Sequence, residues 1–376
     1  MTAAQFSINQ TLVFEVAKKG LKKTRVQPLN IEQALNHNEV LLKVTKFALT
    51  ANNISYGMTG DVLGYWRFFP TEKSEEQAQW GRLPVMGFAD VVSSRCQHIK
   101  VGERVWGFMP MATHVKILAG QVSASRFSDI SPCREGLSPL YARFDRVKNN
   151  PFYLANNEDY DILLRGLFTT AWLVDDFMFD RDYFKAQQYL ITSASSKTSI
   201  ALAFAIQQRG ERPTIGITSA ANQKFVESLG CYQKVISYNQ ISSLDPSVGS
   251  ILVDMAGGQT TLLAIHQHFA KQLYYSCQIG ATQHNDIDIN DTLFFDHLPG
   301  VKPQFFFAPS QLKKRSVDWG SSETMKQINN SLLRYIEFCR LIITINHTDN
   351  VNQVDAIYQQ VLAGSADASV GQIISL

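Results

Sequence analysis

A run of small hydroxyl side chains lies between an apolar strand and a helix, and it is the segment best suited to chemistry. Residues 189–203 read YLITSASSKTSIALA, which predicts a buried strand, a tight turn and a helix. A dinucleotide-binding domain has its phosphate loop at such a junction, because the N–H groups and the dipole of the helix start attract an anion. The three spacings at which that loop normally has glycine are occupied here by Ser193, Ser196 and Ser199.

Serine changes what such a loop can do without removing its function. A serine costs about 1 kcal/mol wherever the turn needs a positive φ, and its side chain limits how closely a phosphate can approach. Its hydroxyl can in return donate a hydrogen bond to the phosphate. We therefore predict that the loop holds a pyrophosphate partly through side chains. The predicted phosphate-binding residues are Ser193, Ser195, Ser196, Lys197 and Thr198.

Two other interpretations of this loop stay open. Lys197 and Thr198 are similar to the end of a nucleotide-binding P-loop, whose lysine contacts phosphate, but its two glycine positions hold Ile191 and Ser196. Magnesium-dependent binding of ATP would be needed to retain that hypothesis. The segment could also be a plain strand-to-helix connection that has a Ser/Thr N-cap and binds no ligand.

The residues after the second predicted strand favour NADP over NAD. An NAD site usually has an acidic residue there, which binds the ribose hydroxyls, and residues 218–224 (TSAANQK) contain none. Ser219 and Lys224 could instead accept a 2′-phosphate, although Lys224 could equally be a solvated helix residue. Gly257 and Gly280 end two later strands, where they either let the backbone approach the nicotinamide ribose or simply form turns.

The composition excludes several classes of protein. Hydrophobic residues make up 45% and charged residues 18% of the 376 residues, which is enough core for two domains, and the net charge of +2 argues against a nucleic-acid or membrane partner. No apolar run reaches the ~18 residues of a membrane span, and the N-terminus lacks a signal-peptide pattern. Five dispersed cysteines without a C-x-x-C pair argue against a zinc knuckle and are typical of a reduced, cytoplasmic protein.

The predicted elements fall into two patterns. The first third of the chain has short β-branched or alternating strands, which predict a β-barrel or sandwich. These strands cover residues 11–17, 40–46, 85–93, 104–108 and 112–118. Residues 50–80 interrupt them with an aromatic, irregular segment, either a functional loop or a hydrophobic flap. From residue 189 onward, strands alternate with helices of about ten residues, which predicts an α/β domain with helices on both faces of a parallel sheet.

Several short motifs in this order resemble the medium-chain dehydrogenase/reductase superfamily. They are VGERVWGF at 101–108, FVESLG at 225–230 and VDMAG at 253–257. A closer resemblance, to an uncharacterised branch catalogued as a domain of unknown function, rests on FALTANNISY at 47–56, YWRFFP at 65–70 and the serine loop.

The resemblance implies a GroES-like β-barrel domain joined to a Rossmann doubly wound parallel sheet. We expect the barrel over residues 1–155, the nucleotide-binding domain over 156–310, and a C-terminal segment, 311–376, that packs back toward the barrel. It also implies an NADPH cofactor, a small-molecule substrate and often a homodimer. Zinc-dependent members have the motif G-H-E, whereas in this chain Gly87 is followed by Phe88, Ala89 and Asp90. Those members also have a cysteine ligand near residues 47–51, and this chain has no cysteine there. We therefore expect no zinc and no other metal.

Without zinc, the protein has only to orient the nicotinamide and to supply a proton to the acceptor. Tyr56 and Asn53 correspond to positions that line the cleft of the zinc-free relatives, and Tyr65 is a second phenol on the adjoining segment. Each could instead be a packing residue. The resemblance thus implies an NADPH-dependent reductase of a quinone, enal or enone. The alternative is a dehydrogenase-like fold that lost its cofactor and serves as a binding protein, because all three loop glycines are absent.

Overall fold

The computed structural model describes residues 11–31, 34–71, 74–255, 258–279 and 292–376. Backbone contacts divide the chain into two units. Among the described residues, the first unit contains those up to Leu163 together with Ile345–Ala366 and Val370–Leu376, and the second contains those of Leu164–Thr344 and Asp367–Ser369. This division differs from the sequence-based one, because residues 311–344 belong to the second unit rather than to a separate C-terminal segment.

A closed antiparallel barrel forms the centre of the first unit, as predicted. The barrel closes because β3 pairs with both β5 and β7, in the order β3-β5-β6-β9-β8-β7. Its described strands are β3 (Glu39–Leu49), β5 (Pro84–Ser94), β6 (Arg104–Pro110), β7 (His114–Gly120), β8 (Arg126–Asp129) and β9 (Arg143–Arg146). Alternate residues of β7 are buried, which is the burial that an alternating strand sequence predicts.

Further strands extend this barrel. The C-terminal strand β17 pairs antiparallel with β3, and β16 lies beyond β17. A separate sheet has the order β2-β1-β4. These strands are β1 (Thr11–Ala17), β2 (Thr24–Leu29), β4 (Trp80–Gly81), β16 (Thr344–Thr348) and β17 (Val370–Ser375). Helix α10 (Val354–Leu362) contributes Val354 and Tyr358 to the hydrophobic core that also contains Phe47 and Phe108 of the barrel.

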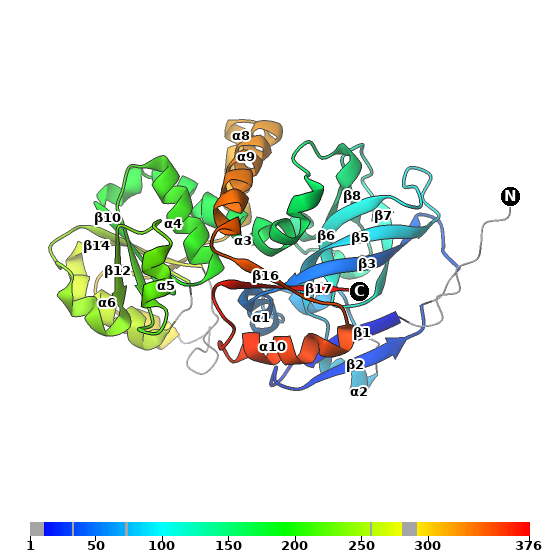
Figure 1. The fold of residues 1–376 in the computed structure, drawn as a ribbon, viewed down its shortest axis with the longest axis horizontal. Helices are drawn as coiled ribbons and strands as arrows, with labels where there is room; N and C mark the ends of the chain where they lie inside the picture. Colours follow the sequence, from blue (N-terminus) through cyan, green and yellow to red (C-terminus); the bar gives the residue numbers. More distant parts are fainter. Residues whose placement is uncertain (1–10, 32–33, 72–73, 256–257, 280–291) are drawn as a thin grey trace. The chain divides into compact units, whose positions relative to one another are not determined.

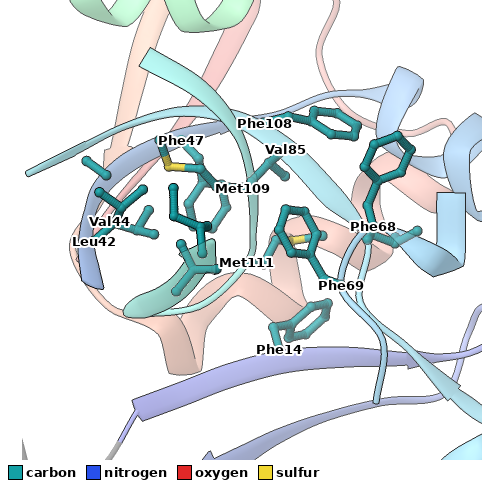
Figure 2. Close-up of a cluster of buried hydrophobic side chains, with 14 of the residues drawn as sticks. Phe14, Leu42, Val44, Phe47, Phe68, Phe69, Val85, Phe108, Met109 and Met111 are labelled. Carbon is teal, nitrogen blue, oxygen red and sulfur yellow. The ribbon is translucent and has the colours of Figure 1, made fainter. Parts of the chain in front are cut away.

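The aromatic segment between residues 50 and 80 is more regular than its sequence indicates. It contains helices α1 (Ala51–Met58) and α2 (Glu75–Ala78), with a 3-10 turn at Tyr65–Arg67. Thr50 and Asn53 form a reciprocal capping box that starts α1. Figure 2 shows Phe68 and Phe69 of this segment beside Phe108 of β6. The hydrophobic packing against the barrel agrees with the flap alternative.

The second unit is built on a parallel sheet in the order β12-β11-β10-β13-β14-β15. Numbered by their sequence order within this unit, the strands run 3-2-1-4-5-6, which is the order of a dinucleotide-binding Rossmann sheet. The described strands are β10 (Gln188–Ile191), β11 (Thr214–Thr218), β12 (Lys234–Ser237), β13 (Ser250–Asp254), β14 (Leu273–Gln278) and β15 (Gln304–Phe305). Every residue of β11 and β13 is buried, because helices cover both faces of the sheet. The predicted fold class is confirmed.

Helices α4, α5 and α6 connect the strands of this sheet, and Figure 1 shows them beside it. The described helices of the unit are α3 (Glu158–Asp180), which begins in the first unit, α4 (Lys197–Arg209), α5 (Gln223–Ser228), α6 (Gln259–Phe269), α7 (Thr292–His297), α8 (Ala308–Asp318) and α9 (Ser321–Arg340). Gly210 ends α4 at φ 76°, in the left-handed region that glycine adopts without strain. On α8, Arg315 is buried, and its Nε donates to Asp176 Oδ2 at 2.7 Å.

Candidate functional site

The turn after β10 takes the shape that a glycine would normally make. Ser193 has φ 48°, in the left-handed region, at the first spacing of the glycine fingerprint. A non-glycine residue there costs about 1–2 kcal/mol. The turn is closed by a 2.7 Å hydrogen bond from Ser196 N to Ser193 O, and Ala194 N donates to Ile217 O at 3.0 Å. Neighbouring strands therefore hold the serine in this conformation.

Two of the serines connect the turn to helix α4. Ser196 is the N-cap, and its Oγ accepts the Ser199 N–H at 3.2 Å and donates to Ser199 Oγ at 2.8 Å. Ser199 is fully buried and donates to Thr192 O at 2.9 Å. Ser199 thus occupies the position where a glycine normally permits close packing of helix and strand, and its hydroxyl is used inside the protein.

Ser195 connects the turn to the end of β11. Its Oγ accepts hydrogen bonds from Asn222 Nδ2 at 3.1 Å and from Thr218 Oγ1 at 3.4 Å. Ser219 follows β11 and is half-buried, and Lys224 is exposed on α5. The structure therefore brings Ser195 and the region after β11 together. Sequence reasoning did not find Asn222, since its contact lies 27 residues away along the chain.

The start of α4 offers unpaired N–H groups. Within the described part of the chain, Ser195, Lys197 and Thr198 have backbone N–H groups without a hydrogen-bond acceptor. The first N–H groups of a helix cannot pair inside it, and the helix dipole places positive potential there. These groups can therefore receive the oxygens of a phosphate, which is the ligand chemistry predicted for the loop.

Lys197 directs its ammonium to a backbone carbonyl. Lys197 Nζ donates to Ala368 O at 3.2 Å, and the Lys197 carbonyl accepts the hydroxyl of Tyr335 at 3.2 Å. Burial lowers the pKa of Lys197 to about 8. A P-loop lysine instead reaches the β- and γ-phosphates, so this contact with Ala368 does not favour the P-loop hypothesis.

A buried carboxyl lies where the strand order reverses, between β10 and β13. Thr192 Oγ1 donates to Asp254 Oδ1 at 2.6 Å and accepts the Met255 N–H at 3.1 Å. Ligands of open α/β sheets bind beside this switch point, at the carboxyl ends of the strands. Gly257 and Gly280, which we predicted to contact the cofactor, lie outside the described residues.

Tyr238 also lies at this edge. It follows β12, and its hydroxyl is 3.5 Å from Ser193 Oγ. Burial raises the pKa of Tyr238, so this phenol stays neutral at physiological pH. Its position directly after the third strand of the alternating pattern was the signal that could have identified it.

In the first unit, the two candidate tyrosines are packed together. The rings of Tyr56 and Tyr65 are 4.4 Å apart, and Tyr141 lies 5.8 Å from Tyr65. Tyr56 Oη accepts a 2.7 Å hydrogen bond from Asn52 Nδ2. Burial raises the pKa of Tyr56 and of Tyr65 well above the usual range, so both phenols retain their protons. Sequence reasoning did not find Asn52 or Tyr141.

Asn53 has a different environment from the tyrosines. Its Oδ1 accepts the Thr50 N–H at 2.7 Å, and its Nδ2 donates to Pro84 O at 2.9 Å. Both ends of the amide therefore hold α1 in place against β5.

The described residues contain no cluster of three or more histidine, cysteine, aspartate or glutamate side chains that could hold a metal ion. In the same part of the chain, no helix has the length and apolar character to cross a membrane.

The family comparison identifies the chain. A model described as "Protein of unknown function (DUF2855)" matches residues 47–367. The chain belongs to this family. No curated protein matches it. The match confirms the resemblance to a branch catalogued as a domain of unknown function.

Several solved structures are similar to this DUF2855 protein over almost its whole length. CurA from Vibrio vulnificus, in complex with NADPH, has a TM-score of 0.62 at 11% identity, covering 97% of this chain and 98% of its own. A putative NADPH:quinone reductase from Bacillus thuringiensis has a TM-score of 0.58 at 15% identity, covering 98% and 99%. The mitochondrial 2-enoyl thioester reductase heterodimer Etr1p/Etr2p from Candida tropicalis has a TM-score of 0.56 at 14% identity, covering 98% and 100%. At these identities the likeness establishes the fold alone, in which an antiparallel barrel and a Rossmann-type parallel sheet occur in one chain.

Proposed function

We propose that this protein is an NADPH-dependent, zinc-free oxidoreductase that reduces a quinone or an activated double bond of a small molecule. The observation that carries the proposal is the α4 start at the switch point. There the unpaired N–H groups of Lys197 and Thr198 follow a turn at Ser193, which adopts the φ normally reserved for glycine. The NADPH complex of the similar CurA structure supports the choice of cofactor.

The residues at this edge fit a dinucleotide. The N–H groups of Ser195, Lys197 and Thr198 would receive the pyrophosphate, together with the Ser193 hydroxyl. Ser196 supports them as N-cap, since its own hydroxyl is used within the helix. Ser219 and Lys224 would take the 2′-phosphate. When bound, the nicotinamide supplies the hydride.

Tyr56 and Tyr65 are the proposed proton donors. A donor must be protonated before the reaction, and burial keeps both phenols neutral. The hydrogen bond from Asn52 fixes the Tyr56 hydroxyl. The amide of Asn53 is occupied by Thr50 and Pro84, so we assign it the positioning of α1.

The five cysteines are all free thiols, which supports a reducing, cytoplasmic location. A homodimer is proposed as well, because the similar thioester reductase from Candida tropicalis is a heterodimer of Etr1p and Etr2p. Sedimentation of the purified chain would test it, and a monomer at micromolar concentration would contradict it.

Cofactor binding is tested by titrating NADPH and NADH against the wild-type chain and Ser196→Asp, with thermal shift as readout. Aspartate is as good an N-cap as serine, so the variant should keep α4 folded. Its carboxylate would repel the pyrophosphate, and we expect NADPH affinity to fall more than tenfold. The matched control is Ser74→Asp, because Ser74 is the exposed N-cap of α2 in the first unit, where its side chain accepts the Gln77 N–H. NADPH oxidation with a panel of quinones and enones would then identify the acceptor class.

The alternative is a dehydrogenase-like fold without cofactor that acts as a binding protein. The engagement of Ser195, Ser196 and Ser199 inside the protein favours it. If neither nucleotide shifts the melting temperature at about 1 mM, where even a binding free energy of about −4 kcal/mol would be detected, the reductase proposal fails and this alternative stands.

A further inference from the structure

A pocket of about 350 Å³ lies within the second unit, between helices α3, α4 and α9. It opens near the C-terminal end of α4, whereas the serine loop precedes the N-terminal end. Phe204, the first α4 residue of the pocket, is about 10 Å along the helix from Lys197. The pocket therefore belongs to a different part of the unit from the proposed cofactor edge. Its volume is in the range of small-ligand sites, about 300–1,000 Å³.

Aromatic side chains form the inner wall of this pocket. Phe168, Trp172 and Phe204 all line it, and all three are buried. Ala205 lines it as well and leaves space beside these rings, because its side chain is a single methyl group. Trp172 and Phe204 keep 8% and 6% of their surface exposed, and Phe168 packs behind them with none exposed. A small apolar ring can therefore contact the accessible parts of Trp172 and Phe204.

The charged groups of the pocket do not balance. Arg209 bonds through Nε and Nη2 to Oδ2 of Asp175, both at 2.8 Å, so these two charges compensate each other. Arg334 has no carboxylate within ion-pair distance in the part of the chain that is described, and its Nη2 donates to Ser331 Oγ at 3.2 Å. Burial raises the pKa of Asp175, which can only add to the positive excess. One positive charge is therefore available to a ligand.

We propose that this pocket binds a small aromatic monocarboxylate, whose ring contacts the accessible parts of Trp172 and Phe204 and whose carboxylate pairs with Arg334. The Asn330 amide lines the same rim and can donate to the second carboxylate oxygen, whereas the Gln327 amide already donates to Glu323 Oε1 at 3.4 Å. An organic cation fits poorly, because two arginines line the pocket and its one carboxylate is already paired. The site adds a second ligand to the protein and does not depend on the proposed reductase activity.

Anthranilate is a suitable probe, because it joins a single aromatic ring to a carboxylate. Its neutral amide, anthranilamide, has almost the same shape. We expect isothermal titration of the full chain to give saturable binding of anthranilate, and binding of anthranilamide at least about fivefold weaker, since the charge-assisted bond is lost. Arg334→Gln should weaken anthranilate binding by the same factor. Lys313→Gln is the matched control, because this exposed lysine of α8 lies outside the pocket, and it should bind like the wild type.

A second variant tests the position of the site. Ala205→Phe fills the pocket without removing a polar group, and it should abolish anthranilate binding. Circular dichroism would show whether the variant folds, and Arg334→Gln tests the same pocket if it does not. Saturating NADPH should leave anthranilate binding unchanged.

Three results would overturn the proposal. The first is the absence of saturable anthranilate binding at about 10 mM, a concentration that detects a binding free energy of about −3 kcal/mol. The second is equal affinity for the acid and the amide. The third is displacement of anthranilate by NADPH. The last result would place the acid at the cofactor edge. If NADPH does not bind at all, the reductase proposal is contradicted, but the proposal of an aromatic carboxylate in this pocket is not. The two proposals can therefore fail separately.

Discussion

Thr192 Oγ1 donates a 2.6 Å hydrogen bond to Oδ1 of Asp254, and this bond joins the carboxyl ends of β10 and β13. These strands are neighbours at the point where the order of the parallel sheet reverses. The same hydroxyl oxygen accepts the Met255 N–H at 3.1 Å. Thr192 and Met255 directly follow β10 and β13, so the Thr192 side chain fixes the start of both connections before any ligand binds.

Replacing this threonine by valine should destabilise the fold. Thr192→Val keeps the volume but leaves the buried Asp254 carboxyl and the Met255 N–H without their common partner, which should cost about 2–3 kcal/mol. Urea denaturation would measure the change. Thr170→Val is the control, because Thr170 Oγ1 bonds only to the carbonyl one turn earlier in α3, and its loss should be below about 0.5 kcal/mol. An equal decrease in the free energy of unfolding for both variants would mean that the Thr192–Asp254 hydrogen bond does not stabilise the fold more than the local bond in α3.

The left-handed conformation of Ser193 predicts an unusual order of stabilities. At φ 48°, Ser193→Gly should be more stable than Ser193→Ala by about 1 kcal/mol, because glycine adopts this region without a Cβ clash. At Ser316, inside α8, the order should reverse, with alanine about 1 kcal/mol better than glycine. Chemical denaturation of the four variants tests this, and the same order at both positions would contradict the φ of Ser193.

Burial of Lys197 predicts a pH-dependent effect. Burial lowers its pKa from 10.5 to about 8, so the unfolded chain binds more protons between these values and stability should rise with pH across that window. Below about pH 8 the half-buried amine is charged, and this charge disfavours the folded state. Lys197→Met should therefore raise the melting temperature at neutral pH, by an amount that shrinks toward pH 10.5. Lys224→Met, at an exposed position of α5, should show neither effect. A flat wild-type profile above pH 8 would rule out the burial.

Glu158 predicts the opposite dependence at low pH. Burial raises its pKa, but hydrogen bonds from Arg104, Lys46 and Tyr153 outweigh this and hold it at about 2, below the ordinary 4.5. The unfolded chain then binds more protons between these values, so the stability that Glu158 contributes is complete above 4.5 and is lost as the pH falls toward 2.

Glu158→Gln should therefore lower the melting temperature at neutral pH and reduce its slope between pH 4.5 and 2. The exposed Glu227→Gln provides the comparison and should retain the wild-type slope. If both variants melt with the same pH profile as the wild type, Arg104 does not stabilise the Glu158 carboxylate in solution.

The sequence predicted the two-part fold because its evidence is local. Buried parallel strands such as β11 and β13 read as apolar runs, and a helix end such as Gly210 needs a positive φ that glycine adopts easily. The region around α1 was harder to predict. Its start depends on a capping box between Thr50 and Asn53 in a segment whose polar and aromatic residues have no clear helical period.

The partners of the candidate site were decided by the tertiary structure. The sequence by itself placed the serine loop, and it placed Tyr56 and Tyr65 in one segment, but it could not show that Ser195 meets Asn222 or that Lys197 turns to Ala368. The sequence could also not show that Arg334, which forms no ion pair within the described residues, lines the pocket between α3, α4 and α9. A short polar side chain has several rotamers of similar energy, and only the packing of distant strands and helices determines which acceptor it reaches.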